Sequence, residues 1–384
     1  MLQPKKERLP LRGISYLIFI VFLSTLSNTI LIPIFPLYLK NLVSNDVFVG
    51  YIFTFIAVLF LGYTLLFRKL IGKIKKIALL RIGLIGNAAT LLIITIITSI
   101  KQFLILELFR TFFLVAAIIT MGLFIREYSS INSIGRTEGQ YFTILNIGFL
   151  IGPLLGGLLA SASSYNTVFI ISAILKVILA LILFMEPLKE REIVQKQKMR
   201  FLDYIKNKQL LLLYVLNFGL VIWFITLYTF LPLYISENGF SEKTIGYLLS
   251  AAVIPLILLE IPVGKFADKY GFKNYMFIGF LIMGLLMLNT YFTSAIATII
   301  IIIIATSGAA FVEPLVEAYF FKQARKKENE EGLYPIYKTS TDLSQIIFPI
   351  IFSTVLLFSN FKTGFLIVGV FMLLFSLLSL KLTR

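Results

Sequence analysis

Cysteine and histidine are both absent from this chain of 384 residues. Without cysteine there is no disulfide bond and no thiol chemistry. Without histidine, proton transfer near neutral pH must use carboxylates, assisted by Lys, Arg or Tyr. The sequence also lacks a Walker-type GxxxxGK[ST] segment, and it shows no nucleophile–base pair or cluster of metal ligands. These absences predict a chain that is not an enzyme, is not ATP-driven and needs no cofactor.

Charged residues are scarce as well, at 14% of the chain, against about 25% in soluble domains. Hydrophobic residues make up 59%, and the mean hydropathy is +0.94. The apolar runs are close to the ~20 residues that a helix needs to cross a bilayer. Twelve spans are predicted, at 13–38, 47–67, 77–99, 103–125, 139–160, 166–186, 210–235, 244–263, 275–293, 296–320, 333–358 and 363–381. They are predicted as helices because strands of a closed barrel would alternate in polarity.

The net charge of +16 is unevenly distributed between the loops. With the N-terminus placed inside, 28 of the 35 Lys and Arg residues fall on the inner side and four on the outer side. This is the positive-inside pattern. It predicts a protein integral to the cytoplasmic membrane, with both termini cytoplasmic. The basic inner surface suits anionic lipid rather than nucleic acid.

The sequence repeats itself at a separation of 196 residues. The segment PLY at 36–38 returns at 232–234, and Gly50-Tyr51 returns at 246–247. Later matches keep the same register as far as residue 367. Internal duplication of membrane spans is typical of secondary transporters.

The repeat predicts an all-α integral membrane protein of twelve transmembrane helices in two pseudo-symmetric bundles. The bundles are expected at 1–186 and 209–384, with six helices each. The charged segment 187–208 is expected to be a cytoplasmic linker between them.

A short motif follows the eighth predicted span, with the sequence GKFADKYGFK at 264–273. It resembles the GxxxDRxGRK loop of the major facilitator superfamily. The resemblance implies a conformational latch, formed in one transport state and broken in another. Its residues here would be Gly264, Asp268, Lys269, Gly271 and Lys273. Gly264 is expected to let helices approach closely, and Asp268 to lie at a helix end near basic groups.

The fifth predicted span carries the sequence GFLIGPLLGG. It matches the GxxxGPxxGG pattern and resembles the antiporter motif of drug and metabolite exporters in the same superfamily. Glycines one turn apart give a flat face on which another helix packs closely, and the proline permits a kink. The motif residues are Gly148, Gly152, Pro153, Gly156 and Gly157.

Arg110 lies early in the fourth predicted span, and its place is similar to that of the fourth-helix arginine of the superfamily. The resemblance implies a cation that faces the cavity and governs the protonation of a nearby acid. A local ion pair with Glu107, three residues earlier on the same helix face, is the alternative. The two interpretations are compatible. A charge within the membrane favours a functional role.

The two halves differ in their intramembrane charges. The first half supplies cations, whereas the second half supplies Glu313, Glu317 and Asp342. Glu313 is predicted as the proton-coupling acid, since the resemblance places the tenth helix at the cavity. The alternative is a structural cluster in which Glu317 pairs with Lys338 and Glu313 and Asp342 are neutralised by their neighbours. Lys176 is expected either to reach an acid or to snorkel along its own helix.

Further polar and aromatic residues are candidates for lesser roles. Glu260 is interpreted as an acid at the membrane boundary. Asn28 on the first span, and Asn217, Trp223 and Tyr228 on the seventh, are candidates for contact with a substrate.

Together the pattern indicates a secondary transporter working by alternating access as a monomer. The predicted function is proton-coupled export of small organic compounds such as drugs or metabolites, driven by the proton gradient. Coupling and substrate contact are assigned to Arg110, Glu107, Glu313, Asp342 and Lys338. The alternatives are an uptake symporter or facilitator for a sugar, organic acid or peptide, and a non-transporting membrane receptor or scaffold. The sequence does not name the substrate.

Overall fold

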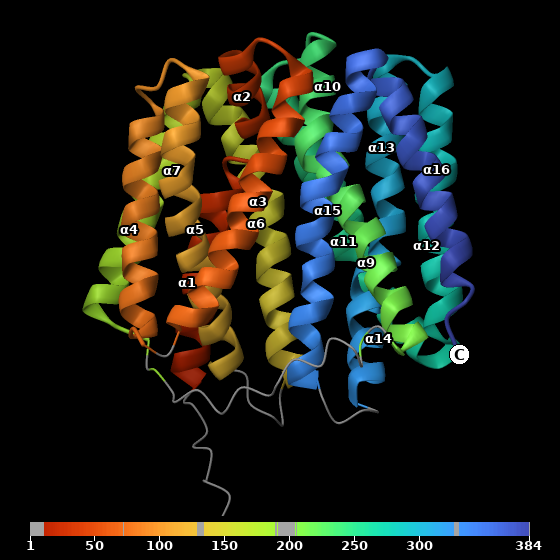
Figure 1. Cartoon of the computed structure of the whole chain (residues 1–384), viewed down its shortest axis with the longest axis horizontal. Coiled ribbons are helices and arrows are strands. Elements are labelled where there is room, and N and C mark those ends of the chain that lie inside the picture. Colours follow the sequence, from red (N-terminus) through yellow and green to blue (C-terminus); the bar gives the residue numbers. More distant parts are fainter. Residues whose placement is uncertain are drawn as a thin grey trace, which may run out of the picture.

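The structure, a computed structural model, describes residues 11–71, 73–128, 134–188, 190, 204, 206–325 and 330–383. The described chain is a bundle of helices that run roughly along one common direction (Figure 1). The N-terminal half contains α1 (Leu11–Thr29), α2 (Phe35–Val43), α3 (Asp46–Leu70), α4 (Lys76–Ile94), α5 (Ile100–Tyr128), α6 (Ile134–Ala162) and α7 (Tyr165–Met185). The C-terminal half contains α9 (Lys208–Ile225), the π-helix η1 (Thr226–Phe230), α10 (Leu231–Glu237), α11 (Glu242–Tyr270), α12 (Phe272–Asn289), the 3₁₀-helix η2 (Thr290–Phe292), α13 (Ala295–Ala310), α14 (Glu313–Arg325), α15 (Glu330–Phe358) and α16 (Phe361–Ser379).

Eleven helical segments in the described ranges are long and apolar enough to cross a membrane. A shorter apolar helix, Ser15–Thr29, precedes them. The all-α membrane fold predicted from the sequence is therefore confirmed, while the first predicted span differs. It is divided between α1 and α2 rather than continuous from 13 to 38. Most of the predicted linker 187–208 lies outside the described residues.

Prolines account for the division of the first span. Pro33 and Pro36 carry no N–H, so neither can bond to the carbonyl four residues earlier. Between the two helices the backbone closes tight turns instead, with Ile32 N–H on the Thr29 carbonyl at 3.1 Å and Ile34 N–H on the Leu31 carbonyl at 3.2 Å. The chain thus leaves the α-helical path in the middle of the bundle.

The corresponding place in the second half is also irregular. Thr226–Phe230 forms the π-helix η1, and α10 begins directly after it with Pro232 in its first turn. Each half therefore interrupts its first helix just before the repeated PLY segment, because that proline removes a backbone donor at the same place.

The 196-residue repeat is visible in the helix bounds. α15 begins and ends 196 residues after α6, and α11 and α16 begin 196 residues after α3 and α7. The N-caps are repeated too: Asn45 and Ser241 precede one pair of helices, and Ser164 and Asn360 the other. Each of these side chains accepts an N–H of the first turn, which stabilises the helix start by about 1 kcal/mol.

The tenth predicted span also differs from a single helix. α13 ends at Ala310, and α14 begins at Glu313 with Pro314 in its first turn. Proline is well tolerated there because the first N–H groups of a helix have no intrahelical acceptor. Glu313 therefore begins a helix in the middle of the membrane instead of lying within one.

The two halves pack against each other through α6 on α11 and through α3 on α15. These helices lie at the centre of the bundle, with the N-terminal half on one side and the C-terminal half on the other (Figure 1). The glycine motif of α6 lies in this region. A Cβ atom added at Gly148, Gly152 or Gly156 would overlap Thr25, Thr29 or Ile30 respectively.

The same motif also contacts the other half. A Cβ atom at Gly157 would overlap Gly246 of α11, and one at Gly246 would meet the Pro153 carbonyl at 2.5 Å. The predicted flat packing face is therefore confirmed. Gly148 and Gly152 face α1 and Gly156 faces the turns that follow it, whereas Pro153 and Gly157 face the other half of the molecule.

We predict that Gly152→Ala destabilises the protein by about 1–3 kcal/mol, because its methyl group has no space beside Thr29. The free energy of unfolding, measured by titration with SDS in mixed micelles, tests this. Gly62→Ala is the matched control, since a Cβ atom at Gly62 on α3 meets nothing within 4 Å. Equal stability of the two variants would contradict the packing argument.

Candidate functional site

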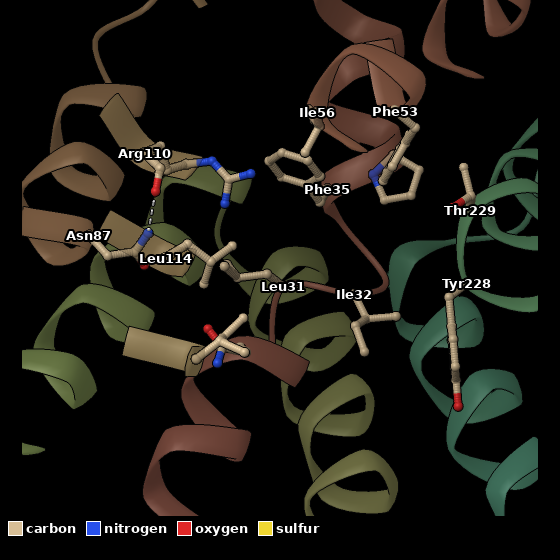
Figure 2. A pocket seen from close by; sticks show the side chains of 13 residues that line it. Leu31, Ile32, Phe35, Phe53, Ile56, Asn87, Arg110, Leu114, Tyr228 and Thr229 are labelled. Carbon is tan, nitrogen blue, oxygen red and sulfur yellow. Dashed lines mark hydrogen bonds between the residues drawn. The ribbon is translucent and has the colours of Figure 1, made fainter. Parts of the chain in front are cut away.

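A cavity of about 310 Å³ lies within the membrane-spanning part of the bundle (Figure 2). Its walls come from α1 to α5 of the N-terminal half, including the turns that join α1 to α2, and from η1 of the C-terminal half. The lining residues are Asn28, Leu31, Ile32, Phe35, Pro36, Phe53, Ile56, Asn87, Arg110, Leu114, Ile118, Tyr228 and Thr229. An apolar wall with a few polar groups is typical of small-molecule sites.

The helix interruptions place residues in this wall. Leu31 and Ile32 lie in the turns between α1 and α2, and Tyr228 and Thr229 belong to η1. Short π-helical insertions in α-helices are frequent at functional sites. Tyr228 also packs against Phe149 of α6, with ring centroids 5.6 Å apart. The cavity is therefore bounded by both halves of the molecule.

Arg110 is the charged residue of the cavity wall, and it is held by Glu107. Its Nε and Nη2 atoms each donate to a Glu107 carboxylate oxygen at 2.6 Å. The Thr111 hydroxyl donates to the same carboxylate at 2.6 Å. Glu107 is fully buried, and Arg110 is 7% exposed. The predicted local ion pair is thus present in the structure.

The ion pair leaves part of Arg110 free for another partner. The guanidinium carbon lies 4.8 Å from the centre of the Phe35 ring, and the group points toward Phe35 in Figure 2. The Nη1 group makes no hydrogen bond within the described part of the chain. Behind it, the Asn87 amide donates to the Arg110 carbonyl at 3.2 Å. The guanidinium group of Arg110 is therefore held by Glu107 at its edge and by Phe35 at its face, and one N–H₂ group remains available.

Lys176 behaves differently from either expectation. Its ammonium reaches from α7 to α1, donating to Ser27 Oγ at 3.1 Å and to Asn28 Oδ1 at 2.5 Å. The side chain is 2% exposed. It contacts no carboxylate among the described residues and does not run along its own helix. Instead it holds Asn28, one of the cavity-lining residues.

Three of the predicted acids lie in the C-terminal half. Glu317 forms an ion pair with Lys338 at 3.3 Å and accepts a hydrogen bond from the Tyr334 hydroxyl at 2.7 Å. The structural pairing of Glu317 with Lys338 is therefore present. Asp342, one turn beyond Lys338 on α15, makes no hydrogen bond or ion pair with any other described residue. Glu313 has a different neighbour.

Glu313 on α14 lies within electrostatic reach of Glu260 on α11, and these two helices are in contact. Glu260 also accepts the Asn146 amide of α6 at 3.2 Å through its Oε2 atom. The interpretation of Glu260 as a boundary acid did not include this contact with the other half of the molecule. The signal that could have identified it is a carboxylate within the apolar run LILLEIPV, which is as costly as the charge at Glu313.

The candidates on the seventh span separate into two groups. Tyr228 lines the cavity, as does Asn28 on the first span. Trp223 is fully buried and outside the lining. Asn217 donates to Ser340 Oγ at 2.6 Å and accepts from the Tyr337 hydroxyl at 3.0 Å, which joins α9 to α15.

The predicted latch segment is helical, not a loop. α11 continues to Tyr270, so Gly264, Asp268 and Lys269 lie in its last turns. A Cβ atom at Gly264 meets nothing within 4 Å, so a close helix approach is not the reason for this glycine. Gly271 ends the helix with a φ of 97°, a backbone angle that residues with a side chain rarely adopt. Lys273 belongs to α12.

Within the described ranges, Asp268 is exposed and forms no ion pair or hydrogen bond. The structure thus shows the backbone of this motif without the contacts of a closed latch.

Hydrogen bonds join the two halves at the end of the bundle that carries α2 and α10, here called the α2–α10 end. Thr54 Oγ1 on α3 donates to the Ile346 carbonyl on α15 at 3.1 Å. The Tyr165 hydroxyl on α7 donates to Glu242 Oε1 on α11 at 2.9 Å. These bonds tie the halves together on that side of the cavity.

Comparison with known proteins assigns the family. A family profile described as Major Facilitator Superfamily matches residues 17–241 and 226–384. The chain therefore belongs to the major facilitator superfamily. It is an integral membrane transporter of a small-molecule substrate, not an enzyme.

Individual relatives agree with this assignment. An uncharacterised MFS-type transporter of Methanocaldococcus jannaschii, MJ1560, is 23% identical, over 76% of this chain and 79% of the relative. The quinolone resistance protein NorA of Staphylococcus aureus is 26% identical, over 88% of this chain and 89% of NorA. The crystal structure of the nucleoside transporter NupG matches 96% of this chain and 98% of NupG, with a TM-score of 0.76 at 16% identity, which shows the shared fold.

We predict that Glu107→Gln destabilises the protein by about 3–5 kcal/mol, because it leaves the buried Arg110 without its counter-ion. SDS titration of the unfolding free energy measures the loss. The double substitution Glu107→Gln/Arg110→Gln should lose less than the sum of the single variants. Additive losses would mean that the two side chains do not stabilise each other.

Proposed function

We propose that this protein exports small organic compounds from the cell in exchange for protons, by alternating access. The observation that carries the proposal is the cavity in the membrane interior, lined from both halves and bearing Arg110 as its charged residue. The relatives support the direction, because NorA is named for resistance to quinolones. The intact glycine motif of α6 supports it further, since it resembles the motif of exporters.

The cavity suits a small compound with an apolar body. Its volume is near the lower limit of about 300–1,000 Å³ for ligand pockets. Phe35, Phe53 and Tyr228 offer aromatic faces for a ring, and offset or edge-on contacts between rings are favourable. The free N–H₂ of Arg110 would orient an acceptor group on the substrate.

The arrangement of the halves supports alternating access. We place the α2–α10 end outside the cell, in the cytoplasmic membrane, because the Lys and Arg residues of the loops gather at the other end. The bonds of Thr54 and Tyr165 would then close the outer side of the cavity. With this orientation the structure would correspond to an inward-facing state, in which a cytoplasmic compound binds. Export would require those bonds to break, while the α6 glycines let α1 and α11 slide past.

Coupling to protons is assigned to Glu313, with Arg110 governing the electrostatics of the cavity. Glu313 lies where α14 begins, and its carboxyl makes no ion pair with the cations described in the structure. Tyr228 lies between the cavity and Glu313, since it lines the cavity and is within electrostatic reach of Glu313. The proton gradient is the driving force, and the working unit is the monomer.

We predict that purified protein in vesicles with an acidic interior dissipates the pH difference when a substrate is added outside. Suitable probes are 1-naphthoate, 1-naphthylmethanol and 1-naphthylmethylammonium, which share one ring system and differ in charge. Glu313→Gln should reduce this proton movement at least 10-fold, because an amide cannot release a proton. Exchange of labelled for unlabelled probe without a gradient should persist, which shows that the variant is folded.

The matched control is Glu186→Gln, which removes an exposed carboxyl group at the end of α7. It should leave proton movement within twofold of the unmodified protein. Export by exchange is contradicted if probes and protons enter or leave together. It is also contradicted if Glu313→Gln retains full coupling.

A further inference from the structure

Lys176 is a buried cation that has no counter-charge beside it. Its ammonium donates to two neutral oxygens, Ser27 Oγ at 3.1 Å and Asn28 Oδ1 at 2.5 Å. Within the part of the chain that the structure describes, Lys176 forms no ion pair. A buried charge without an opposite charge is costly. An anion that enters the neighbouring cavity would lower this cost.

The contact with Lys176 also determines which group Asn28 offers to the cavity. An ammonium can only donate, so the atom of Asn28 beside it must be the amide oxygen. The N–H₂ group of this amide makes no hydrogen bond with another described residue. Because Asn28 lines the cavity, the N–H₂ group is available to a ligand there. Lys176 thus makes Asn28 a hydrogen-bond donor of the cavity wall.

Arg110 supplies a second donor and leaves the wall with an excess of positive charge. Its Nη1 group is available, whereas Nε and Nη2 are bonded to Glu107. The Glu107 carboxylate is shared with the Thr111 hydroxyl as well, so it is fully engaged. Around this wall the described residues therefore place two cations, Arg110 and Lys176, against one acid, Glu107.

The other polar groups of the wall do not offset this charge. The hydroxyls of Tyr228 and Thr229 can donate or accept, so they do not select a charge. Asn87 is neutral, and its N–H₂ group donates to the Arg110 carbonyl. No carboxylate belongs to the lining of the cavity as the described residues form it. The wall therefore favours a group that carries negative charge and offers only acceptors.

The rest of the wall suits an aromatic body. Phe35 and Phe53 pack edge to face, with ring centroids 5.9 Å apart. Tyr228 lies across the cavity from Arg110 in Figure 2. A compound can therefore place an anionic group beside Arg110 while its ring lies among these aromatic side chains, where ring contacts are favourable.

We propose that the cavity selects aromatic compounds that carry a carboxylate group, and that Lys176 is the residue that sets this preference. Arg110 and Asn28 donate to the carboxylate oxygens, and the ammonium of Lys176 provides the positive charge from behind Asn28. Lys176 is a positioning residue, because it acts through Asn28 without touching the compound. This assignment rests on the proposed transport of small organic compounds through this cavity.

The first test measures binding of 1-naphthoate, 1-naphthylmethanol and 1-naphthylmethylammonium by equilibrium dialysis. The purified protein is held in lipid nanodiscs near neutral pH, and empty nanodiscs correct for binding to lipid. We predict that 1-naphthoate binds about 10-fold or more tightly than the alcohol, because hydrogen bonds to a charged group are stronger than those between neutral groups. The ammonium probe should bind no more tightly than the alcohol. Equal affinities, a preference for the ammonium probe or no binding of 1-naphthoate overturns the assignment.

Variants of Lys176 test its part in this preference. Lys176→Met removes the charge and keeps the length of the side chain, so the preference for 1-naphthoate over the alcohol should fall about 10-fold. Binding of the alcohol within about threefold of the unmodified protein shows that the variant is folded, and Lys176→Arg should keep the preference. Lys101→Met is the matched control, because it removes the same charge at an exposed position of α5. An unchanged preference in Lys176→Met overturns the role of Lys176.

The second test supplies the missing counter-charge from the protein itself. Asn28→Asp places a carboxylate beside Lys176 and removes the N–H₂ donor. We predict that 1-naphthoate then binds about 10-fold or more weakly, whereas the alcohol loses less, because the ammonium is already neutralised. Asn166→Asp is the matched control, since that amide lies outside the cavity and donates to the Thr95 carbonyl at 3.2 Å. Full preference for 1-naphthoate in Asn28→Asp contradicts the proposed site.

The outcomes separate this substrate class from the proposed function. If 1-naphthoate binds with the expected preference but crosses the vesicle membrane together with protons, the anion site stands and export in exchange for protons is wrong. If the alcohol or the ammonium probe exchanges for protons and 1-naphthoate has no preference in binding, the exchange stands and the anionic substrate class is wrong.

Discussion

The interior of a bilayer offers no water to a buried charge, so each one must find its partner within the protein. Arg110 meets this constraint with Glu107, and Lys176 meets it with the neutral oxygens of Ser27 and Asn28. Glu313 makes no ion pair with the described cations and lies near another acid, Glu260. Only the first of these is a simple ion pair. The other two leave a charge or a proton that a small change in the surroundings can move, and such groups suit a transporter.

Backbone bonding follows the same constraint, and it explains where the cavity lies. A proline in the middle of a spanning helix frees a carbonyl that lipid cannot satisfy. Pro36 and Pro232 interrupt the first helix of each half at equivalent positions, and both interruptions lie beside the cavity. There the irregular backbone is enclosed by protein instead of lipid. The duplicated proline is thus a reason for an internal site, and the aromatic residues Phe35 and Tyr228, which precede the two prolines, belong to its wall.

The sequence predicted the fold at the level of individual helices because duplication leaves an exact register. The bounds of α6 and α15 follow the 196-residue offset at both ends. The packing face of Gly152 was predictable for a similar reason, since small residues one turn apart have one structural use. The partners of long side chains were not. Lys176 and Glu260 each contact another helix, and the choice of that helix depends on tertiary geometry that no local pattern encodes.

Charge separation between the halves is too weak by itself to drive transport. At an effective dielectric constant of about 20, two unit charges ~15 Å apart interact by about 1 kcal/mol, against about 4 kcal/mol at 4 Å. A rocking motion alters a separation of ~15 Å only slightly, so it alters the interaction energy of the two charges by less than about 1 kcal/mol. The coupling energy between two sites is typically about 1–3 kcal/mol. A hydrogen bond or ion pair that forms or breaks changes the interaction energy by more than this. Groups that bond directly across the two halves therefore matter more than distant charges, and the hydrogen bond from the Asn146 amide to Glu260 is one of these bonds.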